Sequence, residues 1–223
     1  MLHSGSRGIG NRLAQHHIDK AKGLMKRQLH ALPDPDLAYF VEGTPEFESY
    51  ISAMLWAQDY ARANRSAMLA LARSAIEGPI GRPVHVTEEV QCHHNYCERE
   101  QHHGRDVWVT RKGAIRARVG DRGIIPGSMA TGSFIVEGLG NPDAYQSASH
   151  GAGRRLSRRA ARKRLTEASL DEAMRGITWN QDARGLLDEH PDAYKDLGAV
   201  MAAQADLVKV VHRLETILNF KGA

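Results

Sequence analysis

The sequence predicts an α+β fold in which helical regions precede and follow a region of short strands. Three observations lead to this prediction. Apolar residues recur at helical spacing in the first third of the chain, between about residues 10 and 76. Short β-rich segments separated by glycine follow over residues 78–136. Helical spacing returns in the last third, and no repeat or low-complexity linker divides the chain, so we expect one domain.

Two helices are expected in the first third. The first covers residues 10–30, and the proline-bearing residues 31–43 form a loop after it. Thr44 then supplies a helix cap, Pro45 suits the first helical position, and the second helix runs to about Ile76. An apolar stripe predicts that one face of this helix is buried. The stripe consists of Tyr50, Met54, Ala57, Ala61, Met68 and Leu71.

The middle of the chain is expected to form short strands, and the last third to form helices. The predicted strands are residues 84–86, 107–110, 115–119 and 134–136. The predicted helices of the last third are residues 156–165 and 170–174. A final helical stripe is predicted from Leu197, Val200, Met201, Leu207, Val208, Val211 and Leu214. Loops at the ends of a rigid sheet commonly carry catalytic residues, so candidate site residues are expected there.

Composition and charge predict a globular protein of a reducing compartment. The chain has 223 residues, 42% of them apolar, which is enough for one large domain with its own core. Cys92 and Cys97 are its two cysteines, and it has no signal peptide and no apolar run long enough to span a bilayer. We therefore expect a cytoplasmic protein without membrane contact. The formal charge of +4 is mild, so the distribution of charge is more informative than its size.

Two segments of the sequence suit phosphate chemistry. Residues 149–154, SHGAGR, place His150 before small residues and a basic run. Small residues let backbone N–H groups approach an anion, and arginines donate charge-assisted hydrogen bonds to phosphate oxygens. Residues 125–133, IPGSMATGS, are typical of a phosphate- or nucleotide-binding loop. His150 is therefore a candidate nucleophile, and a histidine in an ordinary turn is the alternative interpretation.

A basic run follows this histidine. It consists of Arg154, Arg155, Arg158, Arg159, Arg162, Lys163 and Arg164. Such a run attracts a polyanion, and its binding should weaken as salt rises. Arg154 and Arg158 lie four residues apart, so on a helix they would share one face and could hold RNA phosphates near His150. A solvated helix face without a ligand is the alternative interpretation.

Several segments, in the same order, resemble the RtcB family of RNA ligases. Four of them are His3-Ser4-Gly5-Ser6-Arg7-Gly8, Cys92-His93-His94-Asn95-Tyr96, residues 125–133 and residues 149–154. The resemblance continues through Asp188-Glu189 and Ala193-Tyr194-Lys195-Asp196 to Lys221-Gly222. It covers essentially the whole chain and implies an RtcB-like mixed sheet with flanking helices.

The resemblance implies a GTP-dependent RNA ligase. The histidine that attacks the α-phosphate of GTP in this family, forming a histidine–GMP intermediate, matches His150. GMP is then passed to an RNA 3′-phosphate, which can derive from a 2′,3′-cyclic phosphate. The 5′-hydroxyl of another RNA end displaces GMP and forms a phosphodiester. The RNA ends implied are tRNA halves or cleaved RNA. The nucleotide contacts of the family match Ser133, Ala152, Gly153, Tyr194 and Lys221.

The resemblance also implies two manganese ions, with matched histidine ligands at His3 and His94. Imidazole ligands suit manganese and zinc alike, so the choice of metal comes from the resemblance. An upstream aspartate, cysteine and further histidine complete the metal site of the family, and an upstream asparagine and glutamate contribute beside them. None of those motifs occurs in this sequence. We therefore expect residues 1–223 to be the C-terminal portion of a single RtcB-like catalytic domain, incomplete at its N-terminal side and impaired in activity.

Three alternatives stay open at this point. The chain could be a catalytically inactive RNA-binding fragment that keeps the basic run, or a metal-dependent phosphoesterase that uses the same histidines. A separate zinc site is also conceivable within residues 92–103, although the spacing is not a standard structural-zinc pattern. Its candidate ligands are Cys92, His93, His94, Cys97, His102 and His103.

Overall fold

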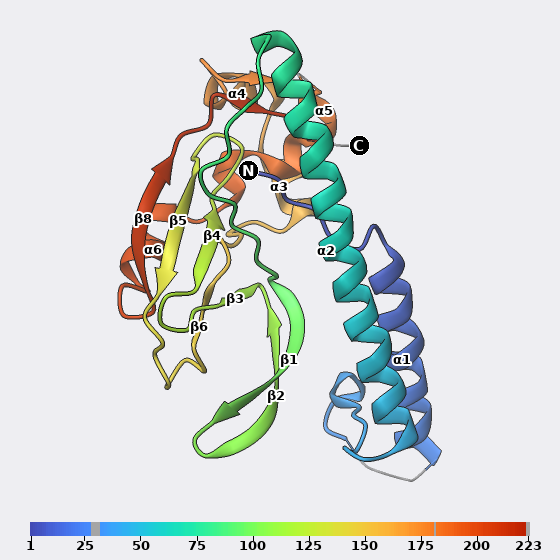
Figure 1. Ribbon diagram of the computed structural model, residues 1–223. Coiled ribbons are helices and arrows are strands. Elements are labelled where there is room, and N and C mark those ends of the chain that lie inside the picture. The colour runs from blue at the N-terminus through green and yellow to red at the C-terminus, as the bar shows by residue number, and fades with distance from the viewer. Residues whose placement is uncertain (28–31, 181, 222–223) are drawn as a thin grey trace. The chain divides into compact units, whose positions relative to one another are not determined.

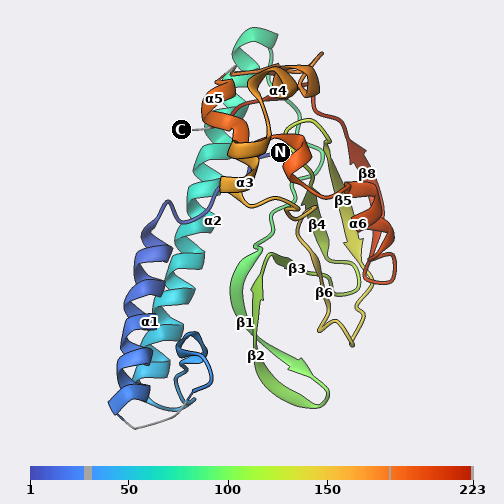
Figure 2. The ribbon, with the colours of Figure 1, turned by 180° about the vertical axis from the view of Figure 1, so that it is seen from behind.

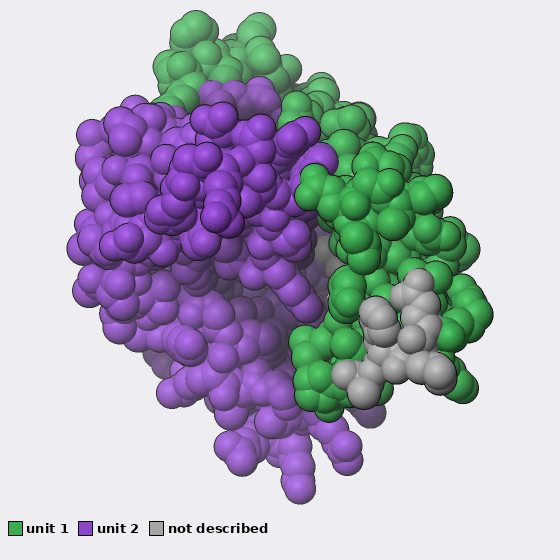
Figure 3. All heavy atoms as spheres, turned by 90° about the horizontal axis from the view of Figure 1, so that it is seen from below, with its two compact units in different colours: residues 1–88 green, residues 89–223 purple. Residues whose placement is uncertain are grey.

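The computed structural model describes residues 1–27, 32–180 and 182–221. The chain divides into two compact units, residues 1–88 and residues 89–223, which we call unit 1 and unit 2 (Figure 3). Unit 1 is helical, whereas unit 2 combines small sheets with short helices. The chain therefore has the α+β class that the sequence predicts.

Unit 1 contains two helices that pack along each other (Figure 1). Its elements are α1 (Ile9–Arg27), the 3₁₀ turn η1 (Pro35–Leu37) and α2 (Pro45–Ile80). The predicted start of α2 is confirmed, because Thr44 Oγ1 accepts a 3.3 Å hydrogen bond from the N–H of Phe47 and Pro45 occupies the first turn. The helix passes its predicted end and stops at Gly81, whose φ of 71° is left-handed. Residues 28–30, the predicted end of the first helix, lie outside the described residues.

The buried face of α2 is narrower than the sequence predicts. Ile51 and Ala61 are buried, whereas Leu71 of the predicted stripe is 72% exposed. On α1, the buried side chains are His17, Ala21 and Met25. Apolar spacing is a property of one helix, while burial also needs a second surface against it, so the stripe overestimates the buried area.

The strands of unit 2 form small separate sheets. They are β1 (Asn95–His102), β2 (Arg105–Lys112), β3 (Ala114–Arg116), β4 (Arg122–Pro126), β5 (Ser133–Gly138), β6 (Ser147–Ser149), β7 (Thr178–Trp179), β8 (Val208–Leu214) and β9 (Leu218–Asn219). β1 pairs with β2 and β3 with β6, both antiparallel, and β7 pairs with β9 in parallel. β4, β5 and β8 form an antiparallel sheet in that order. Two residues with positive φ, His103 and Gly104, join β1 to β2, as a tight hairpin requires.

Short helices lie at two places on unit 2. They are α3 (Arg158–Arg164), α4 (Glu167–Ala173), α5 (Ala183–Leu186), η2 (Leu187–Glu189), η3 (Pro191–Ala193) and α6 (Leu197–Ala202). Figure 2 shows α3, α4 and α5 grouped at one end, with α6 beside the sheet that contains β8. The predicted helices 156–165 and 170–174 correspond to α3 and α4. Among the helices in the described parts of the chain, none combines the length and the apolar character needed to cross a bilayer.

The predicted strand at residues 84–86 is wrong, because this segment is irregular. The N–H of Val84 donates a 2.9 Å hydrogen bond to Glu77 Oε1, and the carbonyl of Val84 accepts one of 2.9 Å from Arg73. Side chains of α2 therefore bind the backbone groups that a strand would offer to a neighbour.

The predicted strand at residues 115–119 is shorter than expected, since β3 ends at Arg116. A turn follows in which the N–H of Arg118 donates to Asp121 Oδ2 at 3.2 Å and the N–H of Asp121 donates to the Arg118 carbonyl at 3.0 Å. Val119 is 81% exposed in this turn, so its β-branched side chain marks no buried strand.

The last predicted helical stripe is only half helical. α6 ends at Ala202, and Val208, Val211 and Leu214 belong to strand β8 instead. Apolar residues at this spacing fit a short strand as well as a helix, and β-branched valines favour the strand. Pairing with β5 supplies the backbone hydrogen bonds that a helix would have supplied internally.

One core connects two sheets of unit 2, β3–β6 and β4–β5–β8, with α6. Its buried members are Ile115, Ala117, Ile125, Val136, Ala148, Ala152, Leu197, Met201 and Val208. A smaller cluster of Met129, Leu170 and Met174 lies under α4. The first core fixes β4 and β6, the two strands whose ends carry the candidate site segments.

Candidate active site

Gly113 holds the backbone of two candidate histidines together. Its N–H donates to the carbonyl of His94 at 2.7 Å, and its own carbonyl accepts a 3.2 Å hydrogen bond from the N–H of His150. Gly113 has a φ of 70°, a left-handed backbone conformation that a residue with a side chain adopts only with strain. A Cβ added there would lie 3.7 Å from Nδ1 of His150. The link between β2 and β3 therefore positions both histidines.

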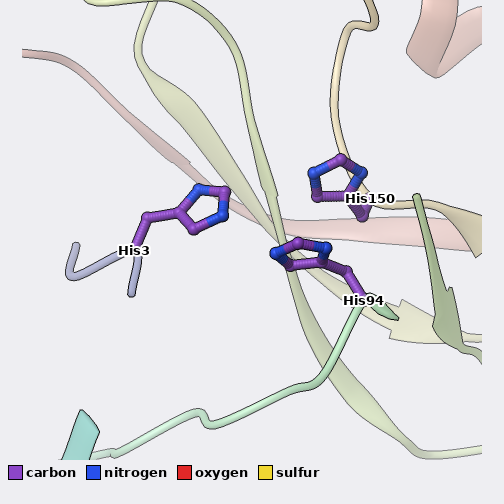
Figure 4. A group of neighbouring side chains, drawn as sticks. All are labelled: His3, His94 and His150. Carbon is purple, nitrogen blue, oxygen red and sulfur yellow. The ribbon is translucent and has the colours of Figure 1, made fainter. Parts of the chain in front are cut away.

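The rings of His94 and His150 stack with centroids 4.2 Å apart and planes 25° apart (Figure 4). A ring nitrogen of each lies within 4.8 Å of one of the other, and both side chains are half-buried. Two nitrogen donors at this separation suit a divalent transition metal. His3 belongs to unit 1, in the segment before α1, and its role as a metal ligand stays a prediction.

The segment after His150 runs along the end of β4. The N–H of Ala152 donates to the carbonyl of Pro126 at 3.2 Å, and Pro126 pairs in register with Ser133 on β5. Ser133 and Ala152 are both buried, and Ala152 is part of the core. Two predicted nucleotide contacts thus meet at the same strand end.

The predicted phosphate loop between β4 and β5 is closed by its own hydroxyl groups. The N–H of Ser128 donates to Thr131 Oγ1 at 2.7 Å, and the N–H of Gly127 donates to the carbonyl of Gly132 at 2.9 Å. A Cβ at Gly132 would lie 2.1 Å from the carbonyl oxygen of Leu214, so only glycine fits against β8. The loop is a tight hairpin, and the donors just named are used inside it.

Gly153 and Arg154 pair with the strand-like segment at Tyr194. The N–H of Lys195 donates to the carbonyl of Gly153 at 3.0 Å, and Arg154 forms an antiparallel bridge with Tyr194. The guanidinium of Arg154 lies 4.9 Å from the centre of the Tyr194 ring, and its Nη1 donates to the phenol oxygen at 3.1 Å. Burial raises the pKa of the Tyr194 phenol, and Glu189 raises it further.

Glu189 joins two of the predicted nucleotide contacts. Its Oε2 accepts hydrogen bonds from the hydroxyl of Tyr194 at 2.6 Å and from Nζ of Lys221 at 3.2 Å. Burial tends to raise the pKa of Glu189, but these hydrogen bonds and the neighbouring cations outweigh it and lower the pKa. Glu189 lies in η2, and the sequence pattern gave it no role, since its partner Lys221 lies 32 positions along the chain.

Lys221 is anchored by strand pairing. β9, which precedes it, lies beside β7, and the Asn180 side-chain amide donates to the Lys221 carbonyl at 3.1 Å. The elements that directly precede Lys221 are the strands β8 and β9, so strand pairing and not a helix orders this end of the chain.

Arg154 and Arg158, the predicted RNA-phosphate contacts, are partnered within unit 2. Arg154 donates to the carbonyls of Leu156 and Asp188 in addition to Tyr194. Arg158 donates to Asp188 Oδ2 at 3.1 Å, although its side chain is 72% exposed. Their RNA-binding role stays a prediction.

The cysteines and histidines of residues 92–103 do not gather into one metal site within the described residues. Cys97 points into unit 2 and accepts a 3.5 Å hydrogen bond from Thr110. His102 is buried against Glu100, with 2.8 Å between Nε2 and Oε2. Successive side chains on β1 point to opposite faces, so the strand separates the candidate ligands.

The family model and three relatives that match this chain all carry the same name, RtcB. A family model described as tRNA-splicing ligase RtcB matches residues 1–222. The RNA-splicing ligase RtcB of Escherichia coli (strain K12) is 48% identical, over all of this chain and 55% of the relative. The RNA-splicing ligase RtcB of Mycobacterium tuberculosis is 35% identical, over all of this chain and 56% of the relative. The tRNA-splicing ligase RtcB of Nanoarchaeum equitans is 30% identical, over all of this chain and 52% of the relative. The chain spans about half the length of the curated relatives it matches.

Proposed function

This chain belongs to the RtcB family, and we propose that it carries the nucleophile and the nucleotide contacts of a GTP-dependent RNA ligase. The observation that carries the proposal is the stacked pair of His94 and His150, held by Gly113 beside a segment of small residues. The relatives are named RNA-splicing and tRNA-splicing ligases, and these names supply the reaction class and the RNA substrate of the proposal.

In the proposed reaction, a neutral imidazole nitrogen of His150 attacks the α-phosphorus of GTP. A P–N bond forms, the bond to the β-phosphate oxygen breaks, and pyrophosphate leaves. The GMP group is then passed from His150 to an RNA 3′-phosphate. The 5′-hydroxyl of a second RNA end attacks that phosphate, GMP leaves, and a phosphodiester forms. His150 is half-buried, so part of its side chain is accessible to a bound nucleotide.

The nucleotide would be held by groups that unit 2 gathers around Glu189. Lys221 offers a cation to phosphate or guanine, and the ring of Tyr194 offers a flat surface and a hydroxyl. Gly153 has a φ of 70° and space around its Cα, which permits close approach of a ligand to the backbone. Ser133 and Ala152 border the same strand end.

Manganese is the proposed metal, with His94 and His3 as ligands from this chain. Imidazole nitrogens such as those of His94 and His3 are donors that suit a borderline divalent ion. Such an ion would neutralise charge on phosphate oxygens as the leaving group departs. His150 stacks on His94, so it would supply the attacking nitrogen beside a ligand of such an ion.

The test is intact-mass spectrometry after incubation with GTP and manganese. The chain is compared with a version extended upstream to the length of its relatives, and each is compared with its His150→Ala variant. We expect a GMP adduct on the extended protein that is absent from its His150→Ala variant. We expect little adduct on the 223-residue chain, because two matched histidines leave most of the metal shell to water.

Two controls sharpen this test. ATP in place of GTP should leave the mass unchanged, because the proposal names the guanine nucleotide. Tryptic mapping of the adduct should place it on the peptide that contains His150. An adduct that survives His150→Ala, or no adduct on any version, would contradict the proposal. The second outcome would favour the RNA-binding interpretation.

A further inference from the structure

Helix α3 divides its positive charge between two faces. Arg158 and Arg162 both reach the buried carboxylate of Asp188, at 3.1 Å and 2.8 Å. Asp188 is 3% exposed and lies in η2. Each of its two carboxylate oxygens forms an ion pair with one of these arginines, and the two ion pairs fix α3 to that turn. The charge on this face is therefore largely neutralised by the protein itself.

The other face of α3 is not neutralised in this way. We call Arg159, Lys163 and Arg164 the α3 basic face. All three side chains are exposed, and none forms an ion pair with any residue that the structure describes. Arg159 and Lys163 are four residues apart and so adjacent on the helix surface. Ser157 and Ala160 complete a hollow of about 450 Å³ that these three residues line.

We propose that the α3 basic face binds the phosphate backbone of single-stranded RNA without reading its sequence. The proposal rests on the proposed function, which supplies RNA as the substrate. Uncompensated cations around a hollow raise the local potential and attract a polyanion. An arginine fork and a lysine ammonium supply donors that phosphate oxygens accept well.

The lining of the hollow favours a nucleic acid over an acidic protein. Specific protein interfaces are anchored by aromatic or large apolar side chains, and the hollow contains none. Its only apolar member, Ala160, is small. Binding to a phosphate backbone needs charge and hydrogen-bond donors alone, and this face has both.

The position of α3 relates this face to the candidate site. Arg159 follows His150 by nine residues. Asp188, which fixes α3, precedes Glu189, whose carboxylate holds Tyr194 and Lys221. The turn η2 therefore supports the helix through one residue and the predicted nucleotide contacts through the next.

The experiment measures RNA binding by fluorescence anisotropy over a range of salt. The probe is a 5′-fluorescein single-stranded RNA of about 12 nucleotides with a 3′-hydroxyl, which has no end that the ligase could join. The chain is compared with the double variant Arg159→Gln/Lys163→Gln. A matched control, Arg105→Gln/Arg213→Gln, removes the same charge from exposed positions on β2 and β8. A swap, Arg159→Lys/Lys163→Arg, keeps the charge and changes the donors.

We expect the double variant to raise Kd several-fold and to reduce the slope of log K against log salt by about 1.4, since each lost phosphate contact accounts for about 0.7. The charge-matched control and the swap should keep the slope. Circular dichroism should show an unchanged fold, because the substituted side chains are exposed. Equal losses in the double variant and the control, an unchanged slope, or no RNA binding at all would overturn the proposal.

Failure here is distinguishable from failure of the proposed function. The GMP adduct on His150 forms without RNA, so it reports on the nucleophile alone.

Polyglutamate of similar length, added as a competitor, should displace the RNA poorly. Equal displacement by polyglutamate would assign the α3 basic face to an acidic protein partner and overturn the RNA proposal.

Discussion

The hydroxyl of Tyr194 donates a 2.6 Å hydrogen bond to Oε2 of Glu189. The same oxygen accepts a hydrogen bond from Nζ of Lys221. Two residues that the family resemblance assigns to the nucleotide thus share one acceptor, Glu189, to which the resemblance assigned no role. A carboxylate in this position fixes both groups before a ligand arrives.

Glu189→Gln in the extended protein should raise the KM for GTP in adduct formation by about tenfold or more. The amide keeps the shape but loses the charge that holds Lys221, and a hydrogen bond to a charged group contributes about 1.5–3 kcal/mol. Measurement of adduct formation against GTP concentration gives KM and maximal rate separately. Asp192→Asn is the control, because Asp192 is exposed and close by in the chain. Equal effects of the two substitutions would contradict a positioning role for Glu189.

Gly113→Ala should affect both stability and reaction at His150. A non-glycine residue at a φ of 70° costs about 1–2 kcal/mol, and the added methyl would lie 3.7 Å from Nδ1 of His150. Gly120→Ala is a matched control, because Gly120 has a φ of 82° and nothing within 4 Å of an added Cβ. Both variants should melt earlier by a similar amount, and Gly113→Ala alone should form the GMP adduct several-fold more slowly. Equal adduct rates in the two variants would exclude Gly113 from the site.

Local sequence signals predicted elements that depend on interactions between neighbouring residues. The start of α2 follows from Thr44 and Pro45, which act within one turn, and the structure has that cap. β8 was predicted as helix because the valines that follow Leu207 fit either period. Only its pairing with β5, far away in the chain, decides between them.

In the candidate site, too, residues with a local sequence signal could be predicted, and residues that act through distant partners could not. His150 stands in a recognisable segment, so sequence alone could name it. Gly113 and Glu189 act through partners that only the fold brings near them: Gly113 bonds to His94 and His150, and Glu189 bonds to Lys221, 32 positions along the chain. No spacing rule relates such positions, because a loop or strand of any length can separate them.

Deleting residues 221–223 from the extended protein should abolish GMP labelling. The deletion removes the Lys221 ammonium from Glu189 but keeps β9, so the pairing of β9 with β7 should survive. Intact mass after incubation with GTP measures the outcome. Deleting residues 222–223 alone is the control and should retain labelling. Retained labelling in the longer deletion would show that Lys221 is not a nucleotide contact.

Glu100→Gln should destabilise unit 2 strongly. The Glu100 side chain is fully buried and accepts hydrogen bonds from Arg111 and His102. Loss of its charge would leave the buried Arg111 guanidinium without a counter-ion, which costs about 3–5 kcal/mol. Chemical denaturation at pH 7 measures this loss. Glu98→Gln is the control, since Glu98 and its partner Arg116 are both about one-third exposed and such a pair contributes about 0–1 kcal/mol.

The pH dependence of stability provides a second measurement on the same carboxylate. Burial tends to raise the pKa of Glu100, but the hydrogen bonds from Arg111 and His102 outweigh it and lower the pKa from 4.5 to about 2. Because the folded chain binds this proton less tightly than the unfolded chain, the ionised group stabilises the fold fully above pH 4.5. That stabilisation is lost as the pH falls from 4.5 towards 2. Between pH 4.5 and 2, the free energy of unfolding should therefore fall more steeply with decreasing pH in the unmodified chain than in Glu100→Gln. Denaturation curves measured at several pH values give this free energy. Equal pH dependence in the two proteins would show that Glu100 titrates normally in the folded state.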